Sequence, residues 1–64
     1  MTIRELKKGD WFTLKPIDEP KASQVWVRGE YDRSTKRYSV TSWDDVNREL
    51  FLKGSREAFT EFTF

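Results

Sequence analysis

The sequence predicts an all-β domain, a small barrel of five short and mostly antiparallel strands that follows a short N-terminal helical turn. Two observations predict this fold class. Runs of Val, Thr and aromatic residues alternate with turn residues at nearly regular spacing along the 64 residues, a pattern typical of small barrels. The stretch 25–43 also has the two-faced alternation of a β-hairpin. A chain of this length is expected to form one domain, so residues 1–64 are a single predicted unit.

The composition indicates how so short a chain would hold a core. The sequence has three Trp, two Tyr and five Phe, and it has neither Cys nor His. A disulfide or a zinc site is therefore excluded as a source of stability. Each buried aromatic ring removes on the order of 150–250 Å² from water, so a few rings would supply area that aliphatic residues alone would not.

The elements are expected in the following order. Thr2 and Glu5 fit a capping box that opens a short turn, which Gly9 ends. The strands are expected at residues 11–15, 24–31, 37–43, 48–53 and 58–64, separated by polar loops and tight turns. The last strand would be tied into the sheet, which makes the final residues part of the fold.

Two details of the later strands are less regular. Phe59 and Phe62 are three positions apart, which breaks strict alternation and indicates either a bulge or one exposed ring. Residues 50–52 are consecutive apolar residues, which is typical of a strand covered on both faces. The predicted core is Ile3, Leu6, Phe12, Leu14, Val25, Val27, Tyr31, Tyr38, Val40, Leu50, Leu52, Phe59 and Phe62.

The hairpin at residues 25–43 is the most informative stretch. We expect Tyr31 to pair with Tyr38 across the loop 32–37. The same register places two further pairs opposite each other, Arg28 with Thr41 and Trp26 with Trp43. Because side chains alternate along a strand, one face would carry Val25, Val27, Tyr31, Tyr38 and Val40, and the other Trp26, Arg28, Glu30, Ser39, Thr41 and Trp43. The second face is more aromatic and charged than a structural hairpin requires.

This second face is the candidate ligand-binding surface. Trp26 and Trp43 would form a stacking platform for bases, proline rings or sugars, with Arg28 and Thr41 beside them. The alternative is a cross-strand aromatic contact that the N-terminal segment or Trp11 covers. The hairpin tip adds three cations, Arg33, Lys36 and Arg37, which would contact phosphate or would form a charged tip that discourages aggregation.

Other chemistries have little support. No His is present to act as a base near neutral pH and no Cys is present to act as a nucleophile, so we expect no enzymatic activity. The cluster of acidic residues at 44–49 lacks the spacing of a calcium loop and is expected to be turn chemistry, so no metal and no cofactor are predicted. No apolar run approaches the roughly 20 residues of a membrane helix, and no signal segment opens the chain. A cytoplasmic protein is the expectation.

Four phrases of the sequence, LKKGDWFTLK, VWVRGEYDRSTKRYSV, DDVNRELFLKG and AFTEFTF, carry a resemblance over nearly the whole chain. They resemble a set of short uncharacterised bacterial proteins, often carried by gut bacteria and sometimes in mobile elements. In architecture the order of strands is similar to an SH3-like barrel. The chain lacks the ALYDY-type motif and the paired Trp-Trp of eukaryotic SH3 domains, and the resemblance implies no established activity.

The sequence therefore predicts a non-enzymatic binding module with two alternatives. The first is association with nucleic acid, in which the two Trp rings stack on bases and the cations contact phosphate. The second is interaction with a protein partner or a second copy of the chain through the same face, since Trp, Tyr and Arg dominate interface hot spots. A net charge of +1 favours the second alternative, whereas the basic hairpin tip favours the first.

Overall fold

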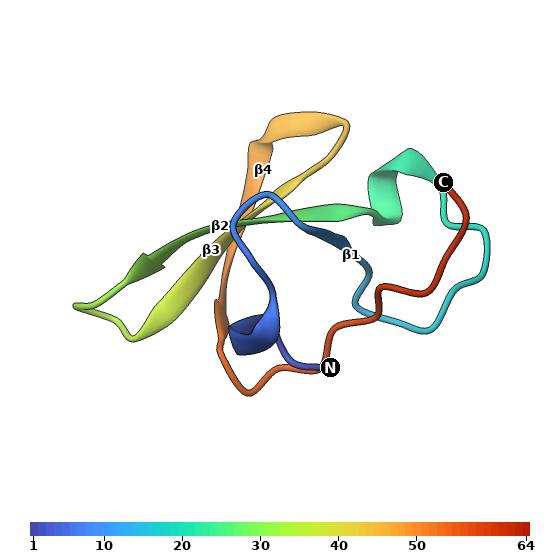
Figure 1. Cartoon of the computed structure of the whole chain (residues 1–64). Coiled ribbons are helices and arrows are strands. Elements are labelled where there is room, and N and C mark those ends of the chain that lie inside the picture. Colours follow the sequence, from blue (N-terminus) through green and yellow to red (C-terminus); the bar gives the residue numbers. More distant parts are fainter.

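The computed structural model describes all 64 residues and is mostly β. Its four strands form one antiparallel, open sheet in the order β1-β2-β3-β4 (Figure 1). The strands are β1 (Trp11–Phe12), β2 (Trp26–Asp32), β3 (Arg37–Ser42) and β4 (Asp45–Lys53), and two single turns of 3-10 helix are η1 (Ile3–Glu5) and η2 (Ala22–Gln24). None of its helices has the length and apolar character to cross a bilayer.

The predicted fifth strand and the closed barrel differ from this structure. Residues 58–64 form no strand, and their only ladder contact is an isolated bridge between Thr13 and Phe59. The reason lies in the irregular spacing of the aromatic residues in this segment. Ala58 is buried, while Phe59 and Phe62 are both half-buried, so the segment covers the sheet with side chains instead of extending its ladder. The first strand is short, because only Trp11 and Phe12 pair with β2, and the next residue, Thr13, pairs with Phe59 instead.

The predicted N-terminal turn is present as η1. The Thr2 N–H and hydroxyl both donate to Glu5 Oε1, at 2.8 and 3.0 Å. These bonds lower the pKa of Glu5, mainly through the backbone N–H of Thr2. Ile3 and Leu6 are buried on the core side of the turn, which explains why so short a helical segment is stable here.

A bulge in β2 decides which side chains face the core. Tyr31 pairs with Tyr38 as predicted, but Gly29 and Glu30 together lie opposite a single β3 residue, Ser39. Beyond this bulge the register shifts by one residue. A one-residue shift moves every side chain to the opposite face, so the remaining pairs are Arg28–Val40, Val27–Thr41 and Trp26–Ser42. The predicted pairs Arg28–Thr41 and Trp26–Trp43 are wrong for this reason.

Gly29 permits this bulge through its lack of a side chain. A Cβ atom at position 29 would lie 2.8 Å from the backbone oxygen of Ser39. That separation is shorter than real Cβ contacts allow. The bulge and the reversal of faces it produces therefore depend on glycine at this position.

The core lies between the sheet and the two ends of the chain. Its fully packed cluster is Ile3, Leu6, Phe12, Trp26, Val40 and Ala58, with Leu14, Tyr38 and Leu52 packed against it. Trp26 and Ala58 were not in the predicted core. Conversely, Tyr31 and Leu50 are exposed, so their assignment to the core is wrong. Tyr31 lies at the hairpin end of β2, and Leu50 lies on the edge strand β4.

Strand β4 is an edge strand, and it is not covered on both faces as predicted. It pairs with β3 from Lys53 back to Glu49, after which three extra residues, 46–48, bulge out before Asp45 pairs with Ser42. Leu50 is 40% and Phe51 is 47% exposed. The consecutive apolar residues of β4 therefore lie on a partly exposed edge strand, and do not indicate burial on both faces.

Candidate functional site

The predicted stacking platform does not form, because the register shift separates its two rings. Trp26 is 6% exposed and belongs to the core, whereas Trp43 is 45% exposed and follows the end of β3. The guanidinium of Arg48 lies 5.2 Å from the centre of the Trp26 ring and covers part of it. Trp26 is therefore a structural residue. The alternative of a cross-strand contact between Trp26 and Trp43 is also wrong, because Trp26 lies opposite Ser42.

Arg28 is also turned toward the interior. Its guanidinium carbon lies 4.5 Å from the centre of the Tyr38 ring, and its Nη1 donates to the Gly29 carbonyl at 3.0 Å. The buried Nε has no hydrogen-bond partner. These contacts hold the side chain against its own sheet. Thr41 is half-buried opposite Val27 and Glu49, so neither Arg28 nor Thr41 is positioned to take a ligand beside Trp43.

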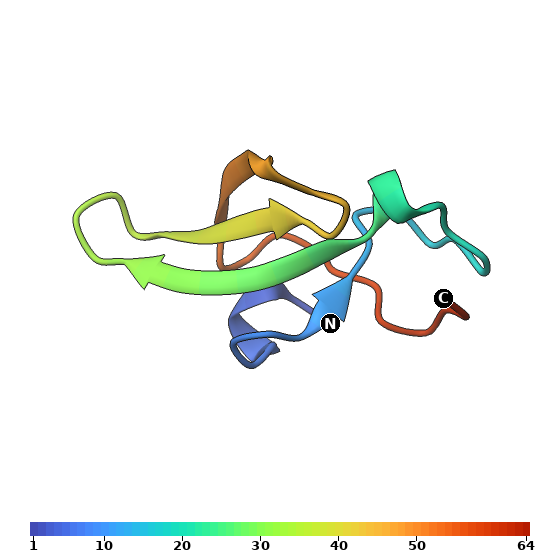
Figure 2. The same cartoon turned by 90° about the horizontal axis from the view of Figure 1, so that it is seen from above.

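The hairpin tip is exposed and lies at one extreme of the molecule (Figure 2). Arg33 and Lys36 have no ion-pair partner, and Lys36 adopts a left-handed φ of 58°. Asp32 Oδ1 accepts hydrogen bonds from the Ser34 hydroxyl (2.7 Å) and N–H (2.9 Å). The hydroxyl bond, followed by the backbone bond, lowers the pKa of Asp32. The tip and Trp43 are separated by the six residues of β3, roughly 20 Å of strand, so the predicted site is not assembled.

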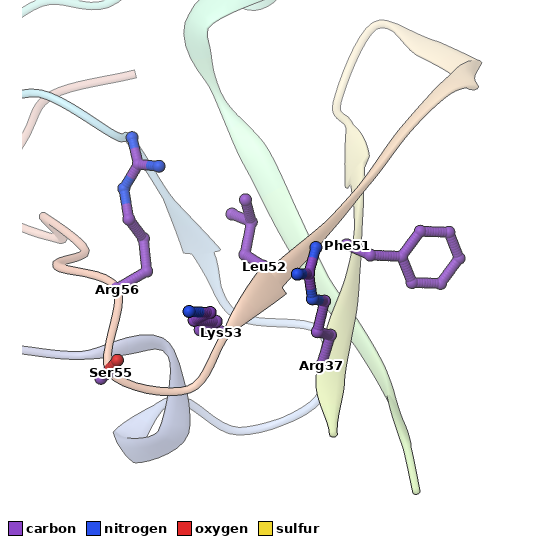
Figure 3. A pocket seen from close by; sticks show the side chains of 6 residues that line it. All are labelled: Arg37, Phe51, Leu52, Lys53, Ser55 and Arg56. Atoms are coloured by element: carbon purple, nitrogen blue, oxygen red, sulfur yellow. The ribbon is translucent and has the colours of Figure 1, made fainter. Parts of the chain in front are cut away.

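The structure instead places cations around a shallow groove at the end of β4. The groove has a volume of about 280 Å³ and is lined by Arg37, Phe51, Leu52, Lys53, Ser55 and Arg56. Of the seven predicted site residues, only Arg37 lines it. Figure 3 shows Arg37 and Lys53 on neighbouring strands and Arg56 on the turn that follows β4. The Phe51 ring points away from Lys53 and Arg56 (Figure 3).

The electrostatics of this groove are unusual for so neutral a chain. Arg37 and Lys53 are directly paired across β3 and β4, and like charges directly opposite each other destabilise a sheet. The ion pairs in the structure are Met1 N-terminus–Glu57 and Lys8–Glu30. Arg37, Lys53 and Arg56 therefore have no carboxylate within 4.0 Å, and no acidic residue lines the groove. The arrangement is suited to holding an anion.

A second exposed feature lies elsewhere on the surface. Trp11, Trp43 and Phe64 form an aromatic patch in which each residue is 44–47% exposed. Their ring centres are 5.0–5.9 Å apart in edge-to-face geometry. Each ring thus supports the other two and leaves nearly half of its surface open. We refer to these three residues as the aromatic patch.

Sequence reasoning missed most of both features. Lys53 ends the predicted strand 48–53, and Ser55 and Arg56 lie in the predicted tight turn that follows it. Their proximity to Arg37 depends on the β3–β4 register. Trp11 and Phe64 come from opposite ends of the chain, so no local pattern joins them. One usable signal existed, because Lys53 and Arg56 are cations within four residues that also contain Gly54 and Ser55.

No group of three or more acidic side chains in the structure is arranged to hold a metal ion. Comparison of the chain with protein-family models, with curated proteins and with solved structures gives no match.

Proposed function

We propose that the protein is a non-enzymatic binding module that associates with nucleic acid through the phosphate backbone, at the groove of Arg37, Lys53 and Arg56. The observation that carries this proposal is the direct pairing of Arg37 with Lys53, with Arg56 beside them and no carboxylate within 4.0 Å. A phosphate between these side chains would offset their mutual repulsion. Arg guanidinium groups also match phosphate oxygens in a two-pronged geometry.

The surroundings of the groove support a chain of phosphates over a single small anion. Arg33 and Lys36 lie on the hairpin tip that directly precedes Arg37, and both are exposed and free of ion pairs. The basic surface thus extends from the groove along the end of the hairpin. On the other side, the Phe51 ring is 47% exposed and offers a face on which an unpaired base would stack.

The near-neutral overall charge limits the strength of this interaction. Only a few phosphates would contact the five cations of this surface, and each contact to a single strand contributes about 0.7 to the slope of log K against log salt. We therefore expect binding with a slope of about −2 to −3. The specificity for sequence would be low, since phosphate contacts carry no base information.

The test is a titration of the ¹⁵N-labelled protein with a short oligothymidylate at low and moderate salt. The expected shifts are confined to residues 33–37 and 51–56. Arg37→Ala and Arg56→Ala should each weaken binding and reduce the salt slope by about 0.7. Lys21→Ala is the matched control, because it removes one exposed cation that does not line the groove. Equal effects from all three variants, or no binding at low salt, would contradict the proposal.

The aromatic patch favours a second candidate function, interaction with a protein partner. Three adjacent rings that are each 44–47% exposed are costly to leave in water, and Trp is enriched in interface hot spots. Trp43→Ala should then abolish capture of a partner while leaving oligothymidylate binding unchanged. If Trp43→Ala captures the same proteins as the unmodified chain, the patch has only a structural role.

We also propose that the four-stranded sheet is the framework of an SH3-like small barrel, in which the segment after β4 takes the place of a fifth strand. This description is supported by two isolated bridges, which connect the segment to Thr2 before η1 (Thr2–Glu57) and to Thr13 directly after β1 (Thr13–Phe59). Slow amide exchange at Phe59, whose N–H donates to the Thr13 carbonyl at 3.0 Å, would support it. Exchange at the rate of an unprotected amide would contradict it.

A further inference from the structure

Strand β4 presents an uncovered edge. It is the last strand of the sheet order, and no backbone group from Arg48 to Leu52 makes a hydrogen bond outside the ladder with β3. Near this edge, the N-terminal segment makes backbone hydrogen bonds only to residues after β4. The Arg4 N–H donates to the Gly54 carbonyl and the Ile3 N–H donates to the Arg56 carbonyl, both at 3.0 Å. The outward-facing backbone groups of residues 49–52 are therefore free to pair with another strand, while the Lys53 carbonyl accepts from the Arg56 N–H at 3.0 Å.

The sequence of this uncovered segment is self-complementary. Residues 49–53 read Glu-Leu-Phe-Leu-Lys. If a second copy is laid antiparallel with Phe51 opposite Phe51, Glu49 falls opposite Lys53 and Leu50 falls opposite Leu52. Each unlike pair then occurs twice because of the two-fold symmetry. Opposite charges and apolar pairs directly across a ladder are both stabilising.

The faces of the sheet agree with this pairing. Glu49, Phe51 and Lys53 share the face that carries Thr41, Ser39 and Arg37, since these are their ladder partners. Leu50 and Leu52 share the core face with Val40 and Tyr38. The symmetric pairing would therefore join two charged pairs and the Phe51 rings on one face, and join the leucines on the other.

Two features of a lone chain also agree with it. Lys53 has no carboxylate within 4.0 Å although it faces Arg37, so the Glu49 carboxylate of a second copy would relieve a like-charge contact. Leu50 and Phe51 are 40% and 47% exposed, and both would be covered by the same pairing. An unrelated partner strand would need a cation opposite Glu49, an anion opposite Lys53 and apolar residues between them. A second copy of the chain supplies this order of residues by symmetry.

We propose that two copies of the protein form a symmetric dimer by antiparallel pairing of β4 with β4, with Phe51 opposite Phe51. The two sheets become one continuous sheet across the two-fold axis. The paired segment is short, so the interface is at the small end of specific interfaces and the dimer is in exchange with the monomer. The bulge at residues 46–48 and the turn after Lys53 limit the pairing at its two ends.

The first test uses cysteine crosslinking, which is clean because the chain has no Cys. Residues directly opposite in an antiparallel ladder have Cα atoms about 4.5–5.5 Å apart, within the range that a disulfide bridges. Phe51→Cys should form a covalent dimer under mild oxidation. Val46→Cys is the matched control, because Val46 lies on the same strand and is 81% exposed but lies outside the paired segment.

Mixed crosslinking then tests the register. Glu49→Cys and Lys53→Cys should crosslink to each other when the two variants are mixed, and each should crosslink to itself much more slowly. A Phe51→Cys protein that oxidises no faster than Val46→Cys would overturn the proposal. Self-crosslinking of Glu49→Cys that equals the mixed reaction would overturn the register.

The second test uses charge reversal, read by sedimentation equilibrium over a range of protein concentrations. Glu49→Lys should lower the association constant at least tenfold, and the double variant Glu49→Lys with Lys53→Glu should restore it, because the reversed charges again pair across the axis. Glu61→Lys is the control with the same change of net charge away from β4. A chain that is monomeric at every concentration, or a double variant that stays as weak as Glu49→Lys, would overturn the dimer.

The proposed dimer interface and the nucleic-acid groove share Phe51 and Lys53, but different variants test the two proposals separately. Arg56→Ala removes a cation of the groove and changes no residue of the paired segment, so it should weaken oligothymidylate binding and leave sedimentation unchanged. Glu49 does not line the groove. Loss of dimerisation in Glu49→Lys therefore supports the dimer whether or not oligothymidylate binds the groove.

Discussion

Replacement of Gly29 by Ala should destabilise the protein by about 2 kcal/mol, although it adds a single methyl group at a half-buried site. The new Cβ would lie 2.8 Å from the Ser39 carbonyl oxygen, whereas ordinary contact begins at 3.4 Å, so β2 and β3 must separate by about 0.6 Å at the bulge. Forcing an extra methyl group into a packed region typically costs about 1–3 kcal/mol. The smaller entropy of an unfolded Ala relative to Gly offsets only about 0.4–1 kcal/mol of a cost of this size.

This change is measurable because the domain is small. A chain of 64 residues has a free energy of unfolding of roughly 3–10 kcal/mol, and about 2 kcal/mol would lower its Tm by roughly 8–16 °C. Urea unfolding followed by tryptophan fluorescence gives the free energy directly. The control is Glu30→Ala, at the neighbouring bulge residue, whose side chain is 74% exposed and pairs only with Lys8. Equal stability of Gly29→Ala and Glu30→Ala would refute the reasoning about the bulge.

Two further predictions follow from side-chain burial and from ionisation. Trp26→Ala should cost about 3–5 kcal/mol, because Trp26 is 6% exposed, whereas Trp43→Ala should cost only about 1 kcal/mol from its ring contacts; similar urea midpoints for the two variants would contradict the assignment of Trp26 to the core. The hydroxyl of Ser34 is the main cause of the lowered pKa of Asp32, and the N–H of Thr2 is the main cause of the lowered pKa of Glu5. As the pH falls, the unfolded chain therefore binds protons at these two groups before the folded chain does. Stability is therefore fully present above the ordinary values of 3.8 and 4.5 and falls as the pH drops below them; Glu5→Gln should flatten this fall, and a profile that rises toward acid pH would contradict the assignment.

The β character, the helical turn and the hairpin were predictable because they depend on local chemistry. Thr2 and Glu5 satisfy each other three residues apart, and the Tyr31–Tyr38 pair is set by the short loop between them. The bulge was not predictable, since its position depends on how Gly29 fits against Ser39. That one residue reversed the faces of the strand, and for this reason Trp26 and Arg28 moved from the predicted surface to the interior.

The candidate site was predictable only at Arg37. Its neighbour Lys53 is the last residue of β4 and Arg56 lies in the turn after it, so both reach Arg37 through a ladder register that three extra residues in β4 determine. The missing fifth strand has a similar cause. Phe59 and Phe62 break the alternation of a strand and are both half-buried, and the segment that carries them meets the sheet region through the single bridge from Phe59 to Thr13.

The contacts between residues 1–3 and 56–58 have a consequence for how fast the protein folds. The Ala58 N–H donates to the Met1 carbonyl at 2.7 Å, and the Ile3 N–H donates to the Arg56 carbonyl at 3.0 Å. Ile3 and Ala58 belong to one buried cluster, so this part of the core closes only when two distant segments of the chain meet. Contacts of such long sequence separation are expected to limit the rate of folding. Until they form, Phe12 and Trp26 of the same cluster would stay exposed, and chaperones that bind apolar segments would recognise the chain in that interval.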